Sequence, residues 1–360
     1  MVALAIGMLA AIVILQVFAL SEARSRASTS GGDAQSNGML TFHQLQSNIA
    51  RSGYGFNSVR LLSCATSWPS GKTIQLAPVT INPLDAGGAA IIPAGDPNTN
   101  TLLVMYGNGD GEPEGNKVDT TNSPSYLLEP LSSASAYTVG DRVVATPNAF
   151  DPTAACPVTL TLDRVTNVAS TGGQKTSPVT VAAGDNTGTA LFNLGQLPSA
   201  LAYAIRNGNL TVCDFMLNDC SVAANTGSAS IWEPIANNIV SLRAQYGRDT
   251  TGPPMDGFVD IYDQTTPATA CDWARISAVR LALVARSGQF EKTDTTTTPS
   301  TPIDVTSTAP VWAGSANVAI DLTKNPDGSA NADWKNYRYK LFEAVVPIRN
   351  VAWMGVPTGC

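Results

Sequence analysis

The first twenty residues of the chain, MVALAIGMLAAIVILQVFAL, contain no charged side chain, and Gln16 is their only strongly polar one. At a rise of about 1.5 Å per residue, a helix of this length spans roughly 30 Å, the thickness of the hydrocarbon core of a bilayer. Apolar side chains would cover every side of such a helix and leave no polar face for water. The segment therefore predicts a transmembrane helix over residues 1–20, buried in lipid or against other protein.

The chain continues into a polar segment that also favours a helix, with no turn signal in between. Its apolar residues recur at steps of three and four, as on one face of an amphipathic helix: Met39, Phe42, Leu45 and Ile49. Three glycines (Gly31, Gly32, Gly38) weaken this helix by about 1 kcal/mol each relative to alanine. We expect the helix to end near Arg51, at the SGYG run of residues 52–55. The predicted division is a helix over 1–53 and a β-rich globular domain over 54–360.

Two other interpretations of the apolar segment stay open. A secretory signal peptide has a basic start and an apolar core of about 7–15 residues. This segment has no Lys or Arg before its apolar run and is longer than that core, although Ala19 resembles part of a cleavage site. A plain single-span anchor fits the segment equally well.

Charge and composition exclude some classes of function. The chain has 360 residues, a formal charge of −7 and only 14% charged residues. An acidic chain of this kind is a poor partner for a polyanion, so we expect no nucleic-acid binding. Ser, Thr, Asn and Gly are abundant, which is typical of a secreted β-rich protein with long polar loops.

Six cysteines follow the apolar segment, and an even number in that position indicates an oxidising compartment. The stretch CDFMLNDC brings Cys213 and Cys220 close enough to close a small disulfide loop. The pairing of the other four stays open. These are Cys64, Cys156, Cys271 and Cys360.

The last third of the chain carries the strongest strand patterns. NIVSLRAQYGR, ARISAVRLALVARS and NYRYKLFEAVVPIRNVAW alternate apolar and polar residues and are separated by loops. They predict an antiparallel sheet with one wet face carrying arginines and one dry face covered by the amphipathic half of the helix. LAYAIRNGNLTVCDF predicts a hairpin of two strands around Asn207-Gly208-Asn209. The predicted fold class is α+β: a long N-terminal helix, transmembrane and then amphipathic, packed on an antiparallel β-sheet domain.

Catalytic patterns are weak in this sequence, and we expect no enzyme. The only histidine, His43, lies on the predicted helix, which leaves no Ser-His-Asp or Cys-His arrangement for the β domain. No G-x-S-x-G, P-loop or H-E-x-x-H motif occurs. Asp256, Asp260 and Asp263 have the chemistry of an acid and base pair, but their setting favours a solvated turn.

No metal or cofactor is predicted. The cysteines are widely spaced and form no CxxC motif, which argues against zinc. The acidic loop GNGDGEPEGN at 107–116 lacks the spacing of a calcium loop, and Pro253 and Pro254 interrupt the ligand spacing in the 249–260 loop.

Both ends of the chain resemble one known family. MVALAIGMLAAIVI resembles the N-terminal segment of type IV pilins. NIVSLRAQYGRD, RISAVRLALVARSG, YRYKLFEAVVPIRN and RNGNLTVCDF resemble the body of PilW-type minor pilins, which are similar in plan to the J pseudopilin of type II secretion. Residues 60–200 are only loosely covered by the resemblance.

The resemblance implies a pilin-like fold and a structural role. The resemblance implies that the protein joins the complex that primes pilus assembly. That complex lies at the pilus tip and supports adhesion or twitching motility. The implied partners are other minor pilins, the major pilin and a PilY-type tip adhesin. Before assembly the protein is expected in the inner membrane, with its globular domain in the periplasm. The alternative is an independent membrane-anchored binding module outside the cytoplasm.

Pilins also begin with a basic leader, a processing-site Gly and a Glu, whereas this sequence starts at Met1 inside the apolar segment. We therefore expect those residues to be encoded ahead of Met1. The nearest basic residues after the segment, Arg24 and Arg26, would otherwise place the body in the cytoplasm.

The apolar segment is the predicted assembly helix. An apolar helix moves from lipid to a bundle of similar helices with little change in environment, so close packing decides association. Ala3, Gly7 and Ala11 have the small-xxx-small spacing that permits close approach, and Ile12 and Ile14 supply apolar contact.

Overall fold

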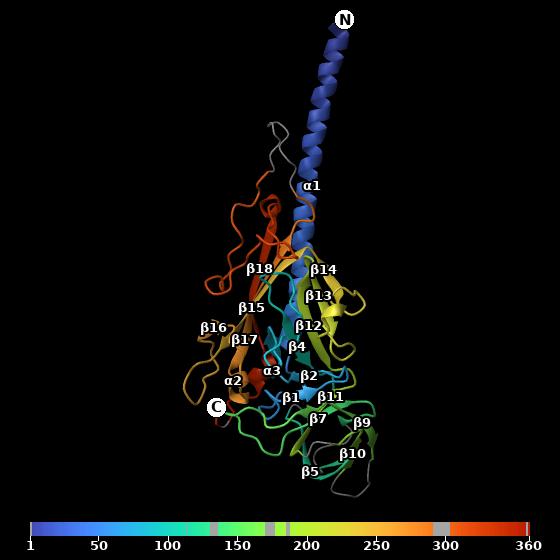
Figure 1. The fold of residues 1–360 in the computed structure, drawn as a ribbon, viewed down its shortest axis with the longest axis vertical. Coiled ribbons are helices and arrows are strands. Elements are labelled where there is room, and N and C mark those ends of the chain that lie inside the picture. Colours follow the sequence, from blue (N-terminus) through green and yellow to red (C-terminus); the bar gives the residue numbers. More distant parts are fainter. Residues whose placement is uncertain are drawn as a thin grey trace.

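The structure is a computed structural model, and it describes most of the chain. It comprises residues 2–112, 114–129, 136–169, 177–184, 188–290, 303–357 and 359–360. Within the first helix, the side chains of residues 2–5, 19–20 and 22–30 lie outside the description. The N-terminus and a β-barrel lie at opposite ends of the long axis (Figure 1).

Helix α1, Val2–Arg51, is the longest element. Its N-terminal part projects beyond the body, and the rest lies along the upper strands (Figure 1). The other helical segments are short. They are α2 at Ala270–Ala274, α3 at Arg349–Trp353, and the 3-10 turns η2 at Ala223–Asn225 and η3 at Trp334–Asn336.

The strands of the described residues form four sheets. The C-terminal sheet has the order β16-β15-β17-β18, with bounds Ile261–Asp263, Ile239–Arg248, Ile276–Arg286 and Tyr339–Pro347. The central sheet has the order β14-β13-β12-β4-β3, with bounds Glu233–Asn237, Asn209–Asp214, Ser199–Arg206, Leu102–Tyr106 and Val79–Ile81. The small sheet has the order β2-β1-β8, with bounds Thr73–Gln75, Ala65–Ser67 and Leu160–Thr161.

The fourth sheet is a closed barrel at the end of the body away from the N-terminus (Figure 1). Its order is β10-β6-β5-β11-β7-β9, with bounds Ser177–Val181, Ser125–Leu128, Asn116–Asn122, Ala190–Gly195, Arg142–Ala145 and Asp163–Val168. Val143, Val165 and Val179 are fully buried in its own apolar core. Closure removes the exposed strand edges that an open sheet of short strands would have.

The predicted α+β class is wrong. In the described part of the chain more residues lie in strands than in helices, so the protein is mostly β. Short strands with Pro and Gly breaks did not reveal that residues 116–195 close into a barrel, because closure depends on pairings between segments far apart in sequence.

The predicted transmembrane part at residues 1–20 is also corrected. Among the described residues, no helix has a stretch that is long and apolar enough to cross a membrane. The side chains described in that segment run from residue 6 to residue 18, fewer than the roughly 20 apolar residues that a span needs. The rest of the predicted span lies outside the described side chains.

The predicted hairpin is confirmed as β12 and β13. Arg206 pairs with Asn209, and the two turn residues between them have positive φ, 51° at Asn207 and 70° at Gly208. Two such residues define the turn that matches the twist of paired strands, and Asn-Gly is its preferred sequence.

The three alternating runs form β15, β17 and β18, which pair antiparallel as predicted. The prediction that one face of this sheet is exposed to solvent is wrong. A loop covers it: Trp312 and Leu322 pack on Val284, and the Arg243 guanidinium, only 8% exposed, donates to the Ala319 carbonyl at 2.6 Å. Alternation shows which side chains share a face, but not whether another segment covers that face.

Candidate assembly surface on helix α1

The projecting part of α1 presents apolar side chains to its surroundings. Ile12 is 51% exposed and Ile14 61% exposed, and Ala11 is exposed as well. A Cβ added at Gly7 would have none of the described atoms within 4 Å. The side chain of Ala3 lies outside the described residues. Four of the five predicted assembly residues are therefore accessible, and their role in assembly stays a prediction.

The other half of α1 is docked on the body through one apolar stripe. Phe42, Leu45 and Ile49 are buried, and the Phe42 ring lies 6.1 Å from the Phe342 ring of β18. Met39 is 63% exposed, so its predicted place on this stripe is wrong. Helical spacing alone permits either residue 38 or residue 39 in that position.

Gly38 occupies the position expected for Met39. It is buried, and a Cβ added there would overlap the Phe342 ring and lie 2.9 Å from Cβ of Ala285. The missing side chain lets the helix backbone approach β17 and β18 closely. From the sequence alone, this glycine was expected only to weaken the helix. The signal for its role was its position four residues before Phe42, on the same face of the helix.

A buried polar contact also holds the docked half. The Asn48 side-chain amide donates to the Tyr203 hydroxyl at 2.7 Å, and the Arg51 guanidinium donates to the Asn48 oxygen at 2.6 Å. Burial of Tyr203 raises the pKa of its hydroxyl, which therefore stays protonated at physiological pH. Arg51 also lies over the Tyr106 ring, 5.1 Å from its centroid. Sequence reasoning missed Asn48, because its partner is 155 positions away.

The C-terminal end of α1 is tied to helix α3. The Asn350 side chain donates to the carbonyls of Arg51 at 3.0 Å and Ser52 at 2.9 Å. Carbonyls at a helix end have no partner within the helix, so this side chain satisfies groups that would otherwise need water.

A groove of about 400 Å³ runs between α1 and the last residues of β18. His43 and Arg51 line it from the helix, and Val345, Pro347 and Arg349 line it from the other side. Val345 is 49% exposed, and β18 stands at one end of the strand order of its sheet. The groove therefore lies beside the docked half of α1.

The aspartates considered as an acid and base pair order their own loop. Their partners are the Phe258 N–H for Asp256, the Thr250 N–H for Asp260 and the Arg248 guanidinium for Asp263. The hydrogen bonds from Thr250 lower the pKa of Asp260, which keeps this carboxylate ionised. Asp249, at the start of the 249–260 loop, is buried and accepts the Gly257 N–H at 2.7 Å.

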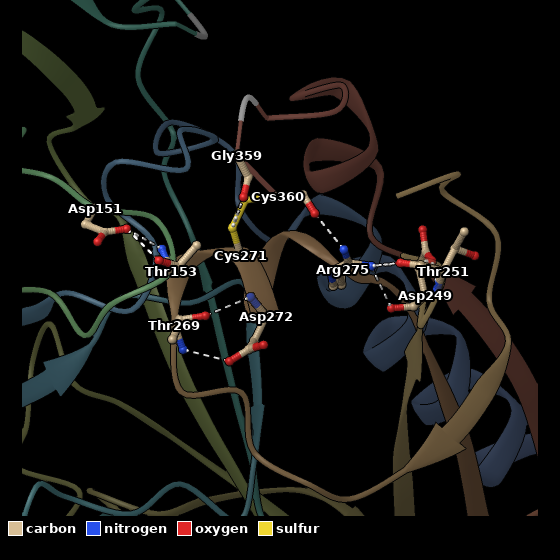
Figure 2. The surroundings of a disulfide bond; sticks show 10 residues. All are labelled: Asp151, Thr153, Asp249, Thr251, Thr269, Cys271, Asp272, Arg275, Gly359 and Cys360. Atoms are coloured by element: carbon tan, nitrogen blue, oxygen red, sulfur yellow. Dashed lines mark hydrogen bonds and ion pairs between the residues drawn. A yellow bond between two sulfur atoms is a disulfide. The ribbon is translucent and has the colours of Figure 1, made fainter. Parts of the chain in front are cut away.

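All three possible disulfides form. The predicted Cys213–Cys220 bond is present, and the pairings left open by the sequence are Cys64–Cys156 and Cys271–Cys360. Figure 2 shows how the last bond fastens the C-terminus to α2. Beside it, the Arg275 guanidinium donates to the Cys360 carbonyl at 2.6 Å and lies 3.7 Å from the buried Asp249 carboxylate.

Comparison with known proteins points to one family. Residues 202–350 match the family model of type IV pilus-assembly protein W, PilW. This range includes most of the confirmed hairpin, strands β15, β17 and β18, and the residues Phe342 and Asn350 that contact α1. No curated protein and no solved structure gave a significant match. The resemblance to the PilW family is therefore confirmed over residues 202–350, and it supports the involvement of this protein in type IV pilus assembly.

Proposed function

We propose that the protein is a minor pilin of a type IV pilus that acts in the complex priming assembly at the pilus tip. The observation that carries the proposal is the division of α1. One part projects with exposed apolar side chains such as Ile12 and Ile14, and the other is docked on the body that matches the PilW family. Exposed apolar surface of this extent marks an interaction site.

The proposed partners of the projecting part are the helices of other minor pilins and of the major pilin. Small residues at Gly7 and Ala11 favour close helix–helix contact, and the neighbouring aliphatic side chains favour dense packing. The proposed location of the body is the periplasm before assembly and the cell surface afterwards, carrying a PilY-type adhesin. Three disulfides support a compartment outside the cytoplasm.

The test places a charge in the proposed interface. In cells that lack the wild-type gene, Ile12→Lys is expected to abolish incorporation into sheared pili and to reduce piliation, because an ammonium group cannot be buried between apolar helices without a partner. The matched control is Val311→Lys, which places the same charge on the body at a residue that is 76% exposed. Normal levels of the Ile12 variant in purified pili would defeat the proposal.

The same experiment separates the minor pilin from an independent binding module. A binding module that is no part of the pilus predicts unchanged piliation when its gene is deleted. A minor pilin of the priming complex predicts few or no pili in that deletion and restoration by the Val311→Lys protein.

A further inference from the structure

A second recess lies on the body, and none of its lining residues belongs to α1. It has a volume of about 820 Å³ and is formed by four segments that are distant in sequence. Arg60 follows the end of α1, Glu112 and Glu114 belong to the loop before β5, Phe150 belongs to the loop after β7, and Trp353 ends α3. We call this recess the C-terminal cleft.

Covalent and polar links join three of the four segments that form the C-terminal cleft, those that carry Arg60, Phe150 and Trp353. Cys64–Cys156 ties the segment that carries Arg60 to the loop that carries Phe150. The Cys271 N–H donates to the Pro152 carbonyl at 2.9 Å, and Cys271 is bonded to Cys360 (Figure 2). These links join the Phe150 wall to the end of the segment that carries Trp353. A cleft held in this way requires little ordering when a ligand binds.

The cleft offers one large aromatic face. Trp353 is 77% exposed, among the highest fractions of the exposed apolar side chains in the described part of the chain. An indole ring is the best aromatic partner for a cation. Phe150 already has a cation, because the Arg60 guanidinium lies 5.5 Å from its centroid.

The charges around the cleft are mainly negative. Glu112 and Glu114 are exposed, against the single cation Arg60 that stacks on Phe150. Asp151 adjoins the Phe150 wall, and hydrogen bonds from Thr153 lower its pKa, so that it remains ionised. The net charge of the chain, −7, adds a long-range attraction for cations.

We infer that the C-terminal cleft binds an extended segment of a partner protein that carries lysine or arginine. One cationic side chain stacks on Trp353 and pairs with Glu112 or Glu114, while the segment lies between the walls. Charge complementarity selects this occupant, since exposed carboxylates beside a free indole match a cation attached to an apolar stem. The inference concerns a different surface from α1, so it does not depend on the proposed pilin function.

The direct test uses the full chain and the peptide fluorescein-Gly-Arg-Gly-Lys-Gly-amide, labelled at its N-terminus, in about 20 mM salt, followed by fluorescence anisotropy. The peptide is expected to bind saturably and to weaken as salt rises. Trp353→Ala and the pair Glu112→Gln/Glu114→Gln are each expected to lower affinity about tenfold, which corresponds to about 1.4 kcal/mol. Because these side chains are exposed, the variants should unfold at the wild-type temperature, which circular dichroism checks.

Matched controls remove similar groups elsewhere. Phe258→Ala removes an aromatic side chain that is 74% exposed, and Asp119→Asn/Glu233→Gln removes two exposed carboxylates. Both controls should bind the peptide like the wild type. Any one of three results overturns the inference. The first is no binding of the peptide, and the second is an equal loss of affinity in the controls and the cleft variants. The third is tighter binding of a Glu-substituted peptide, or of the neutral sugar chitotriose, than of the basic peptide.

Discussion

The two halves of α1 are continuous in sequence and use their apolar side chains in opposite ways. In the docked half, Leu45 and Ile49 are at most 1% exposed against the body. In the projecting half, Ile12 and Ile14 are more than half exposed. An apolar stripe on a helix therefore shows a need for a partner, but not whether the same chain supplies it. The predictions below test this difference, from the largest expected effect to the smallest.

Truncation in the docked half should be strongly destabilising. Leu45→Ala is expected to lower the free energy of unfolding by about 2–5 kcal/mol, because it leaves a cavity between α1 and the sheets. Ile14→Ala removes a similar side chain from the projecting half and should change it by less than about 0.5 kcal/mol. Urea unfolding of the dilute protein measures both. Equal losses would show that the two halves do not differ as described.

Two glycines of α1 should respond in opposite directions to alanine. Gly38→Ala forces a methyl group against Phe342 and Ala285 and should destabilise the protein by about 1–3 kcal/mol. At Gly32 a Cβ would meet none of the described atoms within 4 Å, so Gly32→Ala should stabilise the helix by about 0.5–1 kcal/mol. Thermal unfolding distinguishes the two. Stabilisation by alanine at both positions would refute the close approach at Gly38.

A smaller loss of stability than at Gly38 is expected for the polar contact of the docked half. Asn48→Leu leaves the buried Tyr203 hydroxyl without the amide and should lower the free energy of unfolding by about 1–2 kcal/mol. Adding Tyr203→Phe removes the unsatisfied group and should recover part of the loss, as measured in a double-mutant cycle. Strict additivity of the two substitutions would mean that this contact is not energetically coupled.

Local patterns were sufficient where the partner of a residue was near in sequence or belonged to a repeating strand. The Asn207-Gly208 turn, the antiparallel runs β15, β17 and β18, and the Cys213–Cys220 bond were all predictable, since each depends on spacing within a short segment. The burial of Gly38 in place of Met39 was not predictable, because both residues satisfy helical spacing and only the position of Phe342 distinguishes them.

The sequence by itself determined the apolar N-terminal segment, the strand alternation of the last third and the presence of paired cysteines, because these are properties of residue order and composition. Only the tertiary structure decided that residues 116–195 close into a barrel, that a loop covers the outer face of β15, β17 and β18, and that distant segments enclose the C-terminal cleft. Those features depend on contacts between residues far apart in the chain, and many arrangements of such contacts satisfy the same local pattern.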